Sequence, residues 1–192
     1  MKVLIVVDMQ KDFVDGVLGT PEAQAIIPKV CDEIQKRADK DTLVIFTKDT
    51  HTEDYMNTLE GKHLPVPHCI KGTPGHGIVG EVLASYVNVF KQYMDPWDVY
   101  PAETNPILIN KPTFGSIELQ NVLYSIADNN YIEEVSLMGV CTGICILSNS
   151  LLVKATFPEA EVNVIADCCA CVTPESHKTA LEAMKLCQIN IV

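Results

Sequence analysis

The stretch "KVLIVVDMQ", residues 2–10, contains a run of five apolar, mostly β-branched residues that ends at Asp8. Such a continuous run is typical of a strand buried on both faces of a parallel sheet, whereas a half-exposed strand alternates apolar and polar residues. Five comparable runs follow, the last of them weaker: "DTLVIFTKD" (41–49), "NPILINKPT" (105–113), "EEVSLMGVC" (133–141), "EVNVIADCC" (161–169) and "QINIV" (188–192). The chain therefore has five or six predicted strands.

Helix-like segments separate most of these strands, at residues 22–38, 116–128, 143–156 and 174–187. Thr20-Pro21 and Thr173-Pro174 each resemble a helix N-cap followed by proline in the first turn. Strands that alternate with helices predict an α/β fold, with a parallel sheet covered by helices on both faces. We expect residues 1–192 to form a single domain, since a chain of this length buries a sizeable core without further support.

The composition restricts the classes of partner. The chain has 14 basic and 25 acidic residues, a net charge of -11, which disfavours nucleic acids and anionic membrane surfaces. It has no apolar stretch near the roughly 18 to 20 residues that a membrane span requires, and it begins directly with a strand pattern. We expect a cytoplasmic protein whose eight cysteines are reduced thiols. We expect its ligand to be a small molecule. A homo-oligomer is compatible with the sequence.

Four chemically active residues lie at or just beyond the carboxyl ends of predicted strands: Asp8, Asp49, Lys111 and Cys145. Each alone has an ordinary structural explanation, as a turn cap, a surface lysine or a small core residue. Ligands of open α/β sheets bind at this edge, however, so an acid, a base and a thiol would meet there. This convergence favours covalent acyl transfer.

The proposed chemistry assigns one role to each member of the triad. Cys145 falls in the first turn of the predicted helix, where the helix dipole is expected to lower the thiol pKa. A nearby Lys111 ammonium would lower it further, and Asp8 could accept the thiol proton and return it to a leaving group. Backbone N–H groups of the turn at residues 139–145 would face the developing oxyanion.

A second cluster is predicted in the irregular segment 49–77, which is rich in histidine, proline and glycine. Asp49 and His51 are two residues apart, so their side chains face the same way on an extended chain, and a closing loop could bring His68 beside them. One carboxylate and two imidazoles suit zinc, manganese or iron better than calcium or magnesium. From spacing alone, a surface acid with unrelated histidines is the commoner explanation.

Six motifs together make the sequence specific: "VVDMQKDF" (6–13), "TKDTH" (47–51), "PHCIKGTPG" (67–75), "NKPTFGS" (110–116), "GVCTGICI" (139–146) and "DCCACVTPESH" (167–177). In order and over nearly the whole chain, this set resembles the isochorismatase-like cysteine hydrolases, and among them most closely the nicotinamidases. The resemblance implies a three-layer α/β/α fold with a six-stranded parallel sheet, and a catalytic triad of Asp8, Lys111 and Cys145. It also implies a cis peptide before Cys141 and an oxyanion hole formed by the amides of Cys141 and Cys145.

The same resemblance implies a metal that holds the ring nitrogen of the substrate. Its ligands would be Asp49, His51 and His68, with Glu60 as a further ligand and His63 as the competing choice. Zinc is the expected ion, and manganese or iron are the alternatives. The implied reaction is hydrolysis of nicotinamide to nicotinate and ammonia through a thioester on Cys145, in NAD salvage.

The resemblance further assigns a substrate-lining wall, consisting of Phe13, Leu64, Phe114, Val140 and Cys141. Two of these positions depart from the nicotinamidase pattern. Leu64 stands, with one extra residue, where an aromatic is frequent, and Phe114 stands where a tyrosine is common.

Other functions compete with this interpretation. The alternative enzyme is a metal-free isochorismatase-like amidohydrolase acting on another small amide or ureido compound, and the alternative outside enzymes is a binding or redox protein with the same fold. "CCAC" (168–171) contains a C-x-x-C pair, but it lacks a second pair at zinc-finger spacing and matches a structural stretch of the family. We therefore expect buried or half-buried thiols there.

Overall fold

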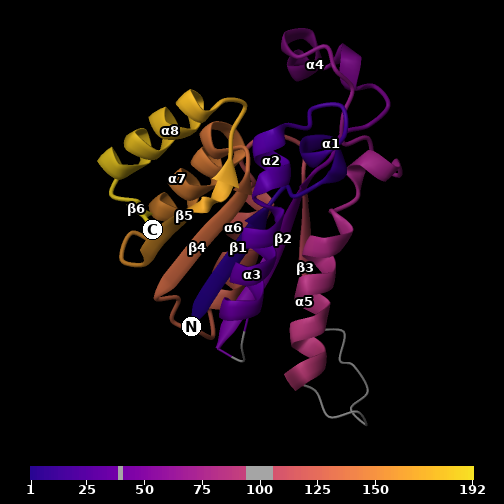
Figure 1. The fold of residues 1–192 in the computed structure, drawn as a ribbon. Coiled ribbons are helices and arrows are strands. Elements are labelled where there is room, and N and C mark those ends of the chain that lie inside the picture. Colours follow the sequence, from indigo (N-terminus) through magenta and orange to yellow (C-terminus); the bar gives the residue numbers. More distant parts are fainter. Residues whose placement is uncertain (39–40, 94–105) are drawn as a thin grey trace.

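The computed structural model describes residues 1–38, 41–93 and 106–192. It contains a six-stranded parallel sheet with the strand order β3-β2-β1-β4-β5-β6 (Figure 1). Asn105, where the third predicted strand would begin, lies outside the described residues. The strands are β1 Lys2–Val7, β2 Thr42–Asp49, β3 Ile107–Lys111, β4 Glu134–Val140, β5 Glu161–Ala170 and β6 Asn190–Ile191. All six predicted strands are therefore confirmed within the described chain.

Helices cover both faces of the sheet and give the predicted three layers (Figure 1). One face carries α2, α3 and α5, and the other carries α6, α7 and α8. The helices are α1 Lys11–Val14, α2 Pro21–Ala25, α3 Ile27–Arg37, α4 Leu59–His63, α5 Gly80–Tyr93, α6 Ile117–Ala127, α7 Leu147–Thr156 and α8 Pro174–Leu186.

Two predicted helices have different bounds in the structure. The segment 22–38 forms two helices that meet at Ile26, because Pro28 in the first turn of α3 has no N–H to continue the ladder from α2. The segment 143–156 begins with a π-helical turn, Thr142–Ile146, before α7. The predicted caps are confirmed, since Thr20 and Thr173 each accept a hydrogen bond from the backbone of their helix.

Helix α5 was not predicted from the sequence. Its residues include several β-branched and aromatic side chains with low helix propensity, but Val82, Tyr86 and Val89 are buried against the core. Tertiary packing therefore stabilises this helix. The segment 49–77 is largely irregular, as predicted, apart from α4 and the 3-10 turns Tyr55–Asn57 and Pro74–His76.

The sheet supplies the hydrophobic core and places the site. All of Val3 to Val7 in β1 are buried, which confirms a strand covered on both faces. Connections from β1 run outward through β2 to β3, and those from β4 run the other way through β5 to β6. The order reverses between β1 and β4, and the crevice beyond the carboxyl ends of two such strands is where ligands bind.

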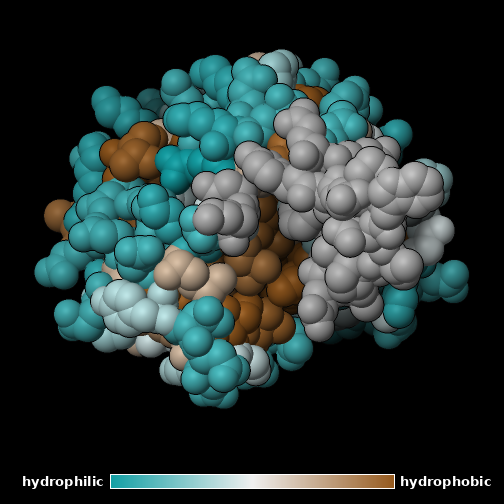
Figure 2. Space-filling model, turned by 90° about the horizontal axis from the view of Figure 1, so that it is seen from below, coloured by the Kyte–Doolittle hydropathy of each residue, from teal (hydrophilic) through white to brown (hydrophobic). Residues whose placement is uncertain are grey.

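The opposite end of the sheet, where the strands begin, has a hydrophobic patch (Figure 2). The four strand-end residues singled out in the sequence are all at the carboxyl end instead. No helix in the described ranges has the length and apolar character needed to cross a membrane.

Gly139 allows β4 to approach β1 closely beside the crevice. Its φ is +120°, a value that residues with a side chain rarely adopt, and a Cβ there would lie 2.1 Å from the carbonyl oxygen of Val7. The close pairing of these two central strands therefore requires glycine.

We expect Gly139→Ala to lower the free energy of unfolding by more than about 2 kcal/mol, because both the dihedral angle and the contact are unfavourable. Gly80→Ala is the matched control, since a Cβ at Gly80 meets nothing within 4 Å. Denaturant unfolding measures both variants. Equal stability of the Gly139 and Gly80 variants would contradict this account of the β1–β4 contact.

Candidate active site

Three of the predicted residues meet beneath the crevice. Asp8 follows β1, Lys111 ends β3, and Cys145 lies in the π-helical turn after β4. Nζ of Lys111 is 2.7 Å from Oδ2 of Asp8 and 3.5 Å from Sγ of Cys145. The acid, the ammonium and the thiol thus form one contiguous group.

Lys111 is fully buried, at 0% exposure, and its ammonium is surrounded by acceptors. Besides Asp8 and Cys145, it lies 3.3 Å from Oδ1 of Asp49 and donates to the carbonyl of Thr113 at 3.1 Å. Burial opposes its charge, but the negative charge of Asp8 in particular raises the pKa of Lys111 above its ordinary value of 10.5. Lys111 is therefore a permanent cation.

Asp8 is held so that one carboxylate oxygen remains available. Oδ1 accepts a hydrogen bond from Thr47 Oγ1 at 2.7 Å. In the described part of the chain, Oδ2 has no partner in hydrogen-bond geometry despite its ion pair with Lys111. Burial raises the pKa of Asp8 above its ordinary 3.8, against the opposing effect of Lys111. A raised pKa makes this carboxylate a stronger base than a solvated aspartate.

The expectation of a lowered thiol pKa is wrong for this structure. Burial raises the pKa of Cys145 well above its ordinary 9.0, and the negative charge of Asp8 adds to the effect, while Lys111 only partly opposes it. The helix terminus, the lysine and the nearby Asp8 can be inferred from sequence position, but the full burial of the thiol cannot. Cys145 is therefore a neutral thiol at rest, next to a base that can accept its proton.

The predicted metal ligands also come together, at the end of β2. Asp49, His51, Glu60 and His68 place one ligand atom each within 4.8 Å of one another. Nε2 of His51 is 2.8 Å from Asp49 Oδ2 and 3.6 Å from Glu60 Oε1. Nε2 of His68 is 3.4 Å and 3.9 Å from the same two oxygens. His63 is exposed and lies outside this group, so the structure favours Glu60 over it.

The chemistry of this group fits a divalent transition metal. Nδ1 of His68 lies 2.8 Å from the carbonyl of Val66, an interaction that leaves Nε2 facing the carboxylates. Burial raises the pKa of Glu60, and the negative charge of Asp49 raises it further, because the two carboxylates repel each other. A cation between them would relieve this repulsion. Two imidazoles and two carboxylates suit zinc, manganese or iron.

The sequence analysis missed three buried polar residues that support the site. Gln10 Oε1 accepts a hydrogen bond from the Asp49 amide at 2.6 Å, and its Nε2 donates to the Asp49 carbonyl at 2.8 Å. Thr47 orients Asp8, and Asn149 donates to the carbonyls of Phe114 and Cys145. A polar residue within a buried apolar run, as at Thr47, is the signal that could have identified them.

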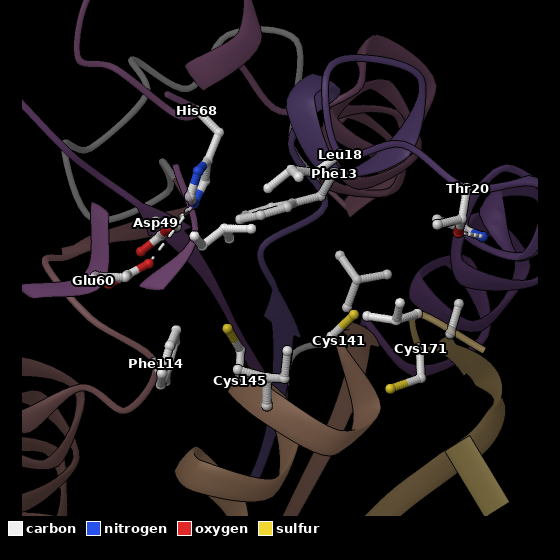
Figure 3. A pocket seen from close by; sticks show the side chains of 16 residues that line it. Phe13, Leu18, Thr20, Asp49, Glu60, His68, Phe114, Cys141, Cys145 and Cys171 are labelled. Atoms are coloured by element: carbon white, nitrogen blue, oxygen red, sulfur yellow. Dashed lines mark hydrogen bonds and ion pairs between the residues drawn. The ribbon is translucent and has the colours of Figure 1, made fainter. Parts of the chain in front are cut away.

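A cavity of about 320 Å³ connects the thiol with the metal-ligand group (Figure 3). Cys145 and Cys141 line it, and Asp49, Glu60 and His68 lie at one end. Asp8 and Lys111 are buried behind its wall. Its wall includes every residue predicted to line the substrate: Phe13, Leu64, Phe114, Val140 and Cys141.

Four further cysteines lie in the wall of the cavity or in the core. Cys168, Cys169 and Cys171 of the "CCAC" stretch are buried, as expected. Burial and the neighbouring Cys171 raise the pKa of Cys141 to about 12. The peptide bond between Val140 and Cys141 is cis, as the resemblance implied.

Comparisons with known proteins agree with this geometry. The sequence matches the isochorismatase domain over residues 2–192. The chain belongs to the isochorismatase family. It is 24% identical to a nicotinamidase of Saccharomyces cerevisiae over 222 residues, a match that covers 100% of this chain and 99% of the yeast protein.

Two solved structures extend the similarity within this family. A pyrazinamidase of Pyrococcus horikoshii in complex with zinc has 28% identity and a TM-score of 0.75, covering 100% of this chain and 98% of that one. A pyrazinamidase/nicotinamidase of Streptococcus mutans has 26% identity and a TM-score of 0.80, with 100% of both chains covered. The expected isochorismatase-like fold is confirmed.

In this isochorismatase-family chain, the two neighbours of Cys145 should shift its titration in opposite directions. Asp8→Asn removes a negative charge and should lower the thiol pKa, whereas Lys111→Met removes a positive charge and should raise it. The rate of alkylation by iodoacetamide against pH reports the thiolate fraction. The unaltered protein should show a midpoint above 9.0. Shifts of the same sign in both variants would contradict the charge arrangement.

Proposed function

We propose that this protein hydrolyses nicotinamide to nicotinate and ammonia through a thioester on Cys145. The observation that carries the proposal is a single cavity with the Cys145 thiol in its wall, the Asp8–Lys111 pair buried behind that thiol, and a metal-ligand group at one end. Similar proteins named nicotinamidase or pyrazinamidase support the choice of substrate.

The first half-reaction forms the thioester. Oδ2 of Asp8 accepts the proton of the Cys145 thiol as Sγ attacks the carboxamide carbon. Backbone N–H groups of Cys141 and Cys145 stabilise the resulting oxyanion, a contribution that is typically worth about 100- to 1000-fold in rate for each donor. Asp8 then donates its proton to the nitrogen, the C–N bond breaks, and ammonia leaves.

The second half-reaction reverses the proton path. Asp8 accepts a proton from water as the water oxygen attacks the thioester carbon, and the C–S bond then breaks. The proton on Asp8 returns to Sγ and restores the neutral thiol, while the product leaves as the carboxylic acid and releases its remaining proton to solvent to give nicotinate. Lys111 keeps its charge throughout and balances the carboxylate whenever Asp8 is ionised.

Asp49, His51, His68 and Glu60 would hold the metal, for which zinc suits the donor set best. A bound ion would offer an open coordination position to the pyridine nitrogen and so fix the carboxamide near Cys145. Positioning of this kind can lower a barrier by several kcal/mol. The four-ligand group is also the feature that favours this reaction over a metal-free amidohydrolase.

The domain organisation and the cellular location belong to the same proposal. We infer one domain over residues 1–192, supported by a sheet that takes strands from both halves of the chain. We also infer a reducing, cytoplasmic location, supported by the eight cysteines of a chain with an ample core.

Cys145→Ala should reduce the turnover of nicotinamide by at least about 10⁴-fold, since the nucleophile is lost. Cys141→Ala keeps its backbone N–H and should remain within about tenfold of the original rate. Ammonia release measures both rates, and thermal unfolding confirms that both variants fold. An equal loss in two folded variants would overturn these roles.

His51→Ala should lower the bound metal content and reduce nicotinamide hydrolysis by about 100-fold or more, because the ring is no longer positioned. His63→Ala is the matched control, as an exposed histidine outside the ligand group.

Removal of the metal by a chelator should reduce nicotinamide hydrolysis as His51→Ala does, while Cys145 still reacts with iodoacetamide. Benzamide, which lacks the ring nitrogen, should be a poor substrate. Full-rate hydrolysis by metal-free protein would instead favour the metal-free amidohydrolase.

A further inference from the structure

The cavity is about twice the size of one that holds a benzene ring. Its volume is about 320 Å³, whereas a cavity of about 150 Å³ is enough to hold a benzene ring. The metal-ligand group occupies one end, and Cys145 lies partway along the floor (Figure 3). A ring held between these two points leaves the other end of the cavity unfilled.

The unfilled end is formed by two segments that are distant in sequence. The chain that leads from α1 into α2 contributes its wall on one side, and the end of β5 with the two residues after it contributes the other. Thr20 and Cys171 lie on the side of Cys141 away from Asp49 and His68 (Figure 3). We define this end as the apolar arm, lined by Leu18, Thr20, Ala23, Ala170, Cys171 and Val172.

Among the residues that the structure describes, the apolar arm has no charged side chain. The carboxyl and imidazole groups of the cavity lining, Asp49, Glu60 and His68, all belong to the metal end. Thr20 Oγ1 is engaged as the cap of α2, accepting from the Ala23 amide at 3.0 Å. The neighbouring Cys141 thiol is neutral. A charged substituent would lose its hydration here without gaining a partner, whereas each buried methylene group favours binding by about fourfold.

We propose that the apolar arm binds an apolar substituent of the substrate, so that the enzyme hydrolyses alkyl-substituted pyridine-3-carboxamides as well as nicotinamide. This inference rests on the proposed function and specifies its substrate class. The chemistry is unchanged: the C–N bond breaks, the S–C bond forms, and Asp8 transfers the thiol proton to the leaving nitrogen. A ring-alkylated substrate releases ammonia, and an N-alkylated substrate releases the alkylamine.

The test compares kcat/KM of the metal-loaded protein for four carboxamides. They are nicotinamide, 5-propylnicotinamide, N-propylnicotinamide and 5-carboxynicotinamide. At least one propyl compound should match or exceed nicotinamide, and the two propyl positions show from which atom the arm is reached. If 5-propylnicotinamide is the propyl compound that is accepted, 5-carboxynicotinamide should be at least about 100-fold worse than nicotinamide, because its charge is desolvated in the arm.

Val172→Trp should narrow the arm and lower the propyl-to-nicotinamide ratio of kcat/KM by about tenfold or more, as expected from the loss of two buried methylene groups. Val17→Trp is the matched control, because Val17 and Val172 are both 60% exposed and only Val172 lines the cavity. The control should leave the ratio unchanged. Leu18→Ala, which widens the arm, should shift the preference toward a longer alkyl chain.

Protection of Cys145 from iodoacetamide measures binding without turnover and separates two failures. One outcome is that nicotinamide is not hydrolysed, but a propyl compound protects Cys145 more strongly than nicotinamide does. The proposed reaction is then wrong, and binding of an apolar substituent in the apolar arm is supported. The other outcome is that nicotinamide is hydrolysed, that both propyl compounds have a kcat/KM more than tenfold lower, and that Val172→Trp leaves the propyl-to-nicotinamide ratio unchanged. This outcome would overturn the proposal that the apolar arm binds a substituent.

Discussion

The buried ammonium of Lys111 is the interaction on which the site depends. It lies 2.7 Å from Asp8, 3.3 Å from Asp49 and 3.5 Å from the sulfur of Cys145. Asp8, Asp49 and Lys111 end or follow the three adjacent strands β1, β2 and β3, so one charge joins three strand ends. Loss of a buried cation would leave two buried carboxylates without compensation, a strongly unfavourable state.

This arrangement links two sites that have different tasks. Asp8 faces the thiol, and Asp49 belongs to the metal-ligand group, yet both carboxylates share the same cation. The positive charge of Lys111 lies between the two carboxylates and offsets their mutual repulsion beside one cavity. The backbone of Asp49 is fixed independently by Gln10, through hydrogen bonds to its amide and its carbonyl. The distance between the thiol and the metal-ligand group is therefore set by buried, polar contacts within the sheet edge.

Much of the fold could be predicted because strands buried on both faces leave continuous apolar runs in the sequence. The positions of Asp8 and Lys111 at strand ends followed from those runs. Helix α5 could not be predicted in the same way, since its stability comes from packing rather than local propensity. The choice between Glu60 and His63 also required the structure, because both lie in α4 and only its orientation decides which faces Asp49.

The raised thiol pKa of Cys145 is the main feature that sequence reasoning had in the wrong direction. The helix terminus, the lysine and the strand-end Asp8 could be placed from the sequence, whereas the degree of burial, which has the largest effect on the thiol pKa, emerges only from the fold. This has a consequence for the mechanism. The Cys145 thiol is neutral before the reaction, and Asp8 removes its proton as the sulfur attacks the carboxamide carbon. The central claim is the covalent route, in which Cys145 attacks the carboxamide carbon and forms a thioester.

Acid quenching during turnover of nicotinamide, followed by mass spectrometry, tests this claim most directly. No lysine or arginine lies between Lys111 and Lys154, so Cys141 and Cys145 share one tryptic peptide and fragment ions must separate them. We expect the mass of a nicotinoyl group on Cys145 that disappears as the substrate is exhausted. An adduct on Cys141, or steady turnover with no adduct under conditions that preserve thioesters, would contradict the account.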